Sequence, residues 1–195
     1  IFKIANGTVP VVETGTFGGP VSKQAEFIKK VNDTGTNAVI VITSLLADRT
    51  DPDELFNERV FELLDLTENI PLGFYECPEP YKRLLSPSQL ATFVATGRIV
   101  YHKDTCLDIN LVKEKLKAEK NHPNFGLYDA YMGHAVASLK AGAAGLSCIQ
   151  GNFFPELIVW LCENYANEAL QTEVEVVQQF LIDNMDVMHY VYPTV

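Results

Sequence analysis

Short apolar runs alternate with amphipathic segments along almost the whole chain, and this alternation limits the folds it can adopt. The runs are rich in Val and Ile and have the length of buried strands, whereas the intervening segments carry apolar residues at helical spacing. Strands are predicted at residues 9–12, 37–43, 70–75, 99–103, 125–128 and 145–149. Helices are predicted at residues 21–31, 52–64, 86–95, 108–119, 132–140, from 155 onward, and 172–190. Strands that are each followed by a helix indicate a parallel sheet covered by helices.

Two architectures are compatible with consecutive βα units of this kind. A doubly wound open sheet normally has a glycine-rich phosphate loop after its first strand, which residues 14–20 match only loosely. A (β/α)8 barrel instead places reactive side chains at the carboxyl ends of several strands, as Tyr75, Lys103 and Asn152 would be placed here. The predicted fold class is therefore α/β, a (β/α)8 TIM barrel. Because such a barrel has eight strands, we expect the chain to be an interior stretch of a longer protein.

The composition argues against several classes of function. The 195 residues are 47% hydrophobic and carry a formal net charge of −10, which argues against a nucleic-acid or anionic membrane surface. No segment has the ~20 consecutive apolar residues of a membrane span, and the start lacks a signal-peptide pattern, so a cytoplasmic protein is expected. The four cysteines show no CxxC pair, and neither they nor the histidines have metal-ligand spacing. Reduced thiols and no metal site are therefore expected.

Two strand ends carry the candidate catalytic residues. Lys103 closes the fourth predicted strand, where burial would disfavour its ammonium form and lower its pKa. A neutral lysine amine can attack a carbonyl and form a Schiff base. Tyr75 closes the preceding strand and could transfer protons during that chemistry. Because side chains alternate along a strand, Tyr101 should face the interior with Lys103, while His102 and Asp104 face the helices.

The residues around these strand ends form motifs. Tyr75 begins the sequence Tyr-Glu-Cys-Pro, and Lys103, 28 residues further on, lies within Tyr-His-Lys-Asp-Thr. The segment from Gly142 to Pro155 reads GAAGLSCIQGNFFP. In order, spacing and βα context these motifs resemble the N-acetylneuraminate lyase and dihydrodipicolinate synthase family of pyruvate-dependent class I aldolases. They are similar to its Tyr-x-x-Pro motif after barrel strand five, its Schiff-base lysine motif on strand six, and its passage into strand eight.

The resemblance implies a lyase that forms an imine at Lys103, with Tyr75 moving protons and no metal or organic cofactor. It places the chain at barrel strands 3 to 8, with residues 1–170 as a partial barrel. Residues 171–195 would then begin a C-terminal helical extension of the same structural unit. The implied substrate is a small 2-oxo acid, pyruvate or a pyruvate-derived sugar acid, and a homo-oligomer, a tetramer by resemblance, is expected. The expected substrate-binding residues are Thr43, Ser44, Tyr128, Ser147, Ile149 and Asn152.

Two departures from the family pattern leave alternatives open. Pro80 stands where dihydrodipicolinate synthases have an arginine that holds the second substrate's carboxylate, so a different substrate is expected. Leu45 or Leu46 falls where many members have an aromatic relay residue on strand four, and neither leucine can pass a proton. The alternatives are a keto-deoxy sugar acid dehydratase that uses the same imine, and a non-catalytic member that binds keto acids or serves as an oligomer scaffold.

Overall fold

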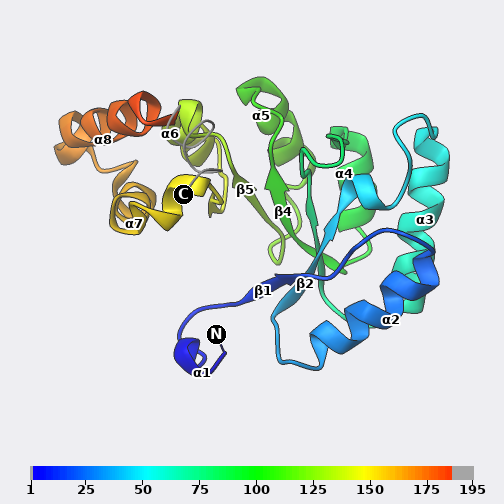
Figure 1. The fold of residues 1–195 in the computed structure, drawn as a ribbon. Helices are drawn as coiled ribbons and strands as arrows, with labels where there is room; N and C mark the ends of the chain where they lie inside the picture. The colour runs from blue at the N-terminus through cyan, green and yellow to red at the C-terminus, as the bar shows by residue number, and fades with distance from the viewer. Residues whose placement is uncertain (1, 186–195) are drawn as a thin grey trace.

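A computed structural model describes residues 2–185, in which six parallel strands form one curled sheet in chain order (Figure 1). Each strand pairs with the next one along the chain, so every connection is a βα crossover of the kind predicted. The strands are β1 (Val12–Thr14), β2 (Ala38–Ile42), β3 (Leu72–Tyr75), β4 (Ile99–Asp104), β5 (Gly126–Asp129) and β6 (Gly145–Leu146).

Helices fill the connections and fall into two groups (Figure 1). The first group lies along one face of the sheet and comprises α2 (Val21–Asn32), α3 (Asp53–Leu66), α4 (Pro87–Val94) and α5 (Ile109–Ala118). The second group lies beyond β5 and comprises α6 (Ala135–Lys140), α7 (Pro155–Asn164) and α8 (Gln171–Asp183). The remaining helical pieces are α1 (Phe2–Ala5) and the 3-10 turns η1 (Thr43–Leu45), η2 (Met132–His134), η3 (Ile149–Asn152) and η4 (Glu168–Leu170). None of the helices within residues 2–185 is both long enough and apolar enough to cross a bilayer.

Local signals in the sequence explain where α4 begins and ends. The Ser86 hydroxyl accepts a hydrogen bond from the Gln89 backbone N–H, and the Gln89 side chain accepts one from the Ser86 N–H. This capping box satisfies donors that the first helical turn would otherwise leave unpaired, and Pro87 suits the first helical position. The helix ends before Gly97, whose φ of 72° is the left-handed conformation that glycine adopts without strain. The sequence predicted this start and stop.

Two hydrophobic clusters hold the layers together. The larger cluster packs β2, β3 and β4 against α2, α3 and α4, with Ile28, Phe56, Phe74 and Phe93 among its fully buried members. The smaller cluster joins α6, α7 and α8 through residues that include Leu161. Burying large aromatic and aliphatic side chains in this way is the main source of stability for the sheet that carries the strand ends.

The two outermost strands and the last helix differ from the prediction. β1 begins at Val12, and β6 has two residues, because each pairs with one neighbour and has less pairing to extend it. The spacing of apolar residues predicts Val176 and Val177 on one face of α8, but the buried positions are Val174 and Leu181, Val177 is partly buried against the smaller cluster, and Val176 is 64% exposed. Val176 therefore lies outside the face of α8 that packs against the smaller cluster. The predicted end of this helix, including Met188, lies outside the described residues.

Candidate active site

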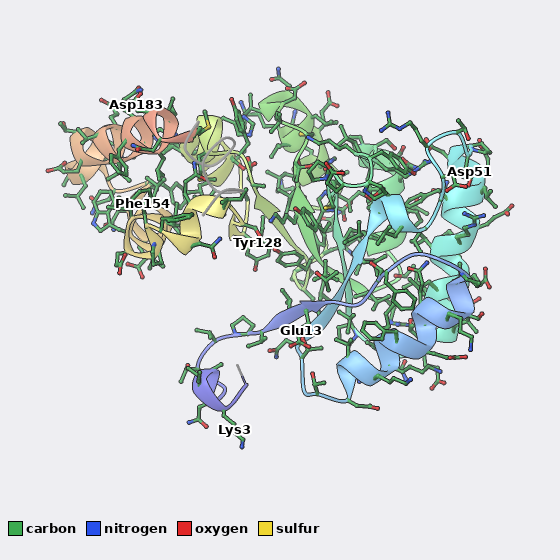
Figure 2. The ribbon with its side chains drawn as sticks, viewed as in Figure 1. Lys3, Glu13, Asp51, Tyr128, Phe154 and Asp183 are labelled. Carbon is green, nitrogen blue, oxygen red and sulfur yellow. The ribbon has the colours of Figure 1, made fainter. Side chains whose placement is uncertain are left out.

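Lys103 lies between two tyrosines in one row of residues across the sheet. The pairing register aligns Tyr75 with Lys103, and Lys103 with Tyr128. Neighbouring strands lie about 4.8 Å apart, so the three side chains project side by side from the same face. Figure 2 shows Tyr128 on the face of the sheet away from α5. The Lys103 Nζ lies 4.4 Å from the centroid of the Tyr75 ring, which puts the amine in contact with the aromatic face.

Glycines in the row below make room for these tyrosines. Tyr101 is in register with Gly73 on one side and Gly126 on the other. A Cβ at Gly73 would lie 2.8 Å from the Tyr101 Cβ, and a Cβ at Gly126 would lie 2.9 Å from the Tyr128 ring. The rings of Tyr101 and Tyr128 stack with centroids 4.6 Å apart, and the Tyr101 hydroxyl donates to the Ser147 Oγ at 2.9 Å. Tyr101 thus shares the face of Lys103, as strand alternation predicted.

Burial shifts the pKa values of the two candidate catalytic groups in opposite directions, in each case toward the neutral form. Removing the Lys103 ammonium from water lowers the pKa of Lys103, although the nearby Cys148 and Cys77 oppose the change. Burial, with smaller contributions from Cys77 and Tyr101, raises the pKa of Tyr75 to about 12. The lysine is therefore shifted toward the neutral amine, a nucleophile, while the tyrosine keeps its proton and can donate it.

A cavity of about 310 Å³ opens over Lys103 and Tyr75. It is lined by Tyr75, Pro78, Lys82, Lys103, Thr105, Leu107, Ala130, Tyr131, Met132, Ser147, Ile149, Gln150 and Met185. Two of these residues are lysines and none is Asp or Glu, although the chain as a whole carries a formal charge of −10. The Lys82 Nζ donates to the Thr105 carbonyl oxygen at 2.8 Å, which holds this second lysine beside the strand end that carries Lys103. The cavity therefore favours an anionic ligand.

The opposite face of the same strand ends is ionic and fully buried. His102 and Asp104 point toward α5, as predicted, where they meet Glu76 and Lys115. The Lys115 Nζ lies 2.7 Å from a carboxylate oxygen of Glu76 and 2.7 Å from one of Asp104.

Within residues 2–185 the four cysteines are free thiols.

Comparison with known proteins identifies the family. A model of the dihydrodipicolinate synthetase family matches residues 1–192. The chain belongs to this family. It is similar to the 4-hydroxy-tetrahydrodipicolinate synthase of Clostridium perfringens, with 24% identity over 163 residues, which are 84% of this chain and 54% of that protein. The chain thus spans about half the length of the curated relatives it matches.

Solved structures of the dihydrodipicolinate synthase fold confirm the barrel. Dihydrodipicolinate synthase from Bacteroides thetaiotaomicron matches with a TM-score of 0.82 and 22% identity, covering 97% of this chain and 62% of that chain. YagE, a prophage protein of the dihydrodipicolinic acid synthase family from E. coli K12 in complex with pyruvate, matches with a TM-score of 0.78 and 18% identity, with coverages of 97% and 62%. The predicted fold class is therefore correct, and the six strands form part of a (β/α)8 barrel.

In this member of the dihydrodipicolinate synthetase family, the residues expected to bind substrate do not all meet at the cavity. Ser147 and Ile149 line it. Tyr128 flanks Lys103 in the sheet but is not among the lining residues. Asn152 is exposed in η3, where its side-chain amide donates to the Ile149 carbonyl oxygen at 3.1 Å.

The two hydroxyl residues after β2 are also placed away from the cavity. Thr43 is fully buried, and its hydroxyl donates to the Arg83 carbonyl oxygen at 2.8 Å. Ser44 lines a different cavity, of about 600 Å³, between the 18–21 and 44–49 segments. Both residues lie in or beside η1, a 3-10 turn that breaks the alternation expected of a longer strand.

Sequence reasoning missed the cavity residues that lie on loops. Lys82, Leu107 and Tyr131 belong to no strand and follow no hydrophobic period, so their positions depend on how the loops fold back over the sheet. The position of Thr105 carried a detectable signal, because two residues beyond Lys103 is the next position on the same face. Gln150 lies in η3, four residues after the end of β6, and no pattern within the 142–155 segment distinguishes it from its neighbours.

Proposed function

We infer that the protein is a lyase that forms a Schiff base between Lys103 and a small 2-oxo acid. The observation that carries this inference is the contact between the Lys103 amine and the Tyr75 ring, at 4.4 Å, beside a cavity whose described lining has lysines and no carboxylate. Burial lowers the pKa of Lys103, which shifts it toward the neutral amine that the reaction needs. Family membership supports the same chemistry.

The proposed reaction begins when the neutral Nζ attacks the carbonyl carbon of the 2-oxo acid. The resulting carbinolamine loses water and becomes a protonated imine, which withdraws electrons from the neighbouring carbon. When the bond between C3 and C4 breaks, the C4 hydroxyl gives its proton to the Tyr75 phenolate left by the dehydration step and C4 leaves as an aldehyde, while the electron pair of the bond moves toward the imine and gives an enamine. A proton then returns to C3, and hydrolysis releases the keto acid and restores the amine.

Tyr75 is the proposed proton donor to the departing water. Burial raises the pKa of Tyr75 to about 12, so its phenol stays protonated at neutral pH and is available to donate. The Tyr101 hydroxyl donates to Ser147, which lines the cavity. This hydroxyl pair is a candidate for the relay that Leu45 and Leu46 cannot provide, and it favours a catalytic protein over a non-catalytic scaffold.

The proposed substrate is pyruvate or a pyruvate-derived sugar acid. YagE, which resembles this chain, has been solved in complex with pyruvate. An imine mechanism needs neither a metal nor an organic cofactor, and a cytoplasmic location is proposed. We also propose a homo-oligomer, a tetramer by resemblance to the family, although one similar structure is of a dihydrodipicolinate synthase variant described as monomeric.

Product analysis on the full-length protein tests this function. An aldolase releases pyruvate and an aldehyde from the sugar acid, whereas a dehydratase of the same family releases water and keeps the carbon chain intact. Lys103→Gln should abolish either activity, while Lys117→Gln, on the exposed side of α5, should leave it unchanged. Turnover that survives Lys103→Gln would contradict the mechanism, and keto-acid binding without turnover in the wild type would indicate the non-catalytic alternative.

A further inference from the structure

Four ionisable side chains meet in the layer between the sheet and α5, behind the candidate catalytic residues. Their side chains are 0% exposed. The Lys115 Nζ contacts both carboxylates at 2.7 Å, and the His102 Nε2 lies 3.4 Å from one and 3.6 Å from the other. We call this group the buried charge cluster; its members are Glu76, His102, Asp104 and Lys115.

Filling a protein interior with ionisable side chains costs free energy that apolar side chains would not cost. Moving charges out of water costs several kcal/mol per ion, and apolar side chains of similar volume often give equal or greater stability. The charges do balance when His102 is protonated, with two cations against two carboxylates. Charge balance explains how the buried charge cluster is tolerated, but it does not explain why charged residues are there.

A bound metal is not needed to account for the cluster. The carboxylates of Glu76 and Asp104 and the imidazole of His102 present ligand atoms within 4.8 Å of one another, a spacing that a divalent ion could use. The Lys115 ammonium, however, already contacts an oxygen of each carboxylate at 2.7 Å. The chain itself therefore supplies the cation that these acids require.

The position of the cluster in the sequence points to its role. Glu76 directly follows Tyr75, and His102 and Asp104 flank Lys103. Because side chains alternate, each catalytic candidate faces the cavity while its neighbours enter the cluster. The cluster thus contains the residues that hold the backbone of both strand ends.

Glu76 ties the ends of β3 and β4 together. Its backbone N–H donates to the Lys103 carbonyl oxygen at 3.3 Å, and its carbonyl oxygen accepts from the Thr105 hydroxyl at 2.6 Å. One carboxylate oxygen accepts from the Thr105 backbone N–H at 3.2 Å, and the other accepts from the Leu85 N–H at 2.8 Å. These bonds lie immediately beyond Tyr75 and Lys103, so they set the distance between the two strand ends.

We propose that the buried charge cluster is a positioning element that holds Lys103 and Tyr75 in contact for imine formation. This proposal rests on the proposed function for its consequence in catalysis. Lys115 pulls the two carboxylates together from α5, and Glu76 transmits that position to the strand ends through Thr105. Neither Glu76 nor Lys115 is among the residues that line the cavity.

Two variants break the ion pairs of the cluster, one by a substitution directly after β3 and the other by a substitution on α5. Glu76→Gln keeps the side-chain shape but places an amide donor against the Thr105 N–H or the Lys115 ammonium, and Lys115→Met removes the cation from α5 without altering either strand. The matched controls are Glu114→Gln and Lys117→Met, both exposed on α5. Rates are expressed per folded molecule, measured by circular dichroism, so partial unfolding does not mimic the effect.

The experiment has two readouts on the full-length protein. The first is the rate of borohydride trapping of pyruvate, which should fall about tenfold or more in both variants and stay unchanged in the controls. The second is the labelling of Lys103 by acetic anhydride across a pH series, quantified by peptide mass spectrometry, which needs no imine. At neutral pH the Lys103 labelling should fall about tenfold in both variants, since water that enters the loosened junction favours the ammonium form.

The outcomes separate the two proposals. If pyruvate is trapped on the wild type, and both variants show unchanged trapping and unchanged Lys103 labelling, the positioning role is overturned and the lyase function stands. Reduced Lys103 labelling in the variants, without trapping in the wild type, would support the positioning of Lys103 and overturn the proposed function. Lower stability with unchanged rates per folded molecule would show that the cluster serves folding alone, which also overturns the proposal.

Discussion

The fully buried imidazole of His102 should make the folding stability depend on pH in a way that can be calculated. Burial alone would lower the pKa of His102, but the carboxylates of Glu76 and Asp104 together outweigh burial and raise the pKa above its ordinary value of 6.5. The perturbation is His102→Gln, which keeps a polar side chain of similar length and removes the titrating group.

The sign and size of the effect follow from proton binding in the two states. Below pH 6.5 the imidazole is protonated in both the folded and the unfolded chain, and the stability it contributes is fully present. As the pH rises, the unfolded chain loses the proton first, so the folded chain binds up to one proton more. The free energy of unfolding then falls by up to about 1.4 kcal/mol per pH unit, until the pH passes the folded pKa of His102.

Urea unfolding of wild type and His102→Gln between pH 6 and 8.5 measures this difference, and the wild type is expected to lose stability more steeply than the variant as the pH rises above 6.5. The carboxylates of the cluster titrate at lower pH, because Lys115 and His102 counteract their burial and keep the pKa values of Glu76 and Asp104 low. Parallel stability curves for the two proteins would refute the reasoning, since they would show that folding does not raise the pKa of His102.

Three further predictions concern the cavity side of the sheet. Gly126→Ala should lower the free energy of unfolding by about 1–3 kcal/mol in a urea titration, because the new Cβ would lie 2.9 Å from the Tyr128 ring; an unchanged midpoint would contradict the packing described. Lys82→Gln should raise the KM for the 2-oxo acid about tenfold and change kcat little, as measured by steady-state kinetics, because it removes a cation from the cavity. Tyr101→Phe should cost about 0.5–1.5 kcal/mol of stability and slow turnover, because it removes the hydrogen bond to Ser147; equal kcat in the two proteins would exclude this hydroxyl from the relay.

Strand periodicity was sufficient to predict the directions of the central side chains. Apolar runs of strand length placed β2 to β5 within a few residues of their observed bounds. The period of two then put Tyr101 and Lys103 on one face, and His102 and Asp104 on the other. These assignments depend on backbone geometry alone, which is why a single sequence could support them.

Loop residues could not be placed in the same way. Arg83 is buried and donates to Asp53 and to the carbonyl oxygens of Asp48 and Asp51, and these bonds fold the 79–85 segment so that Lys82 reaches the cavity. No periodic pattern encodes such contacts between distant loops. For the same reason Thr43, expected at the cavity, instead donates its hydroxyl to the Arg83 carbonyl oxygen.

The burial of Lys115 also could not be predicted from the sequence. Its stretch of helix alternates lysine and glutamate and resembles a solvated face, yet Lys115 is 0% exposed while Lys113 and Lys117 are exposed. The distinction depends on which side of α5 faces the sheet, and on acids at Glu76 and Asp104 that come from other elements. Charge composition alone does not separate a buried lysine from its exposed neighbours.

Peptide mapping of a trapped intermediate tests the central claim most directly. The full-length protein is incubated with pyruvate and borohydride, digested, and analysed by mass spectrometry. We predict that the peptide containing Lys103 gains the mass of pyruvic acid less one oxygen atom, and that Lys82, in the same cavity, is unmodified. An unmodified Lys103, or a modification confined to other lysines, would contradict the account.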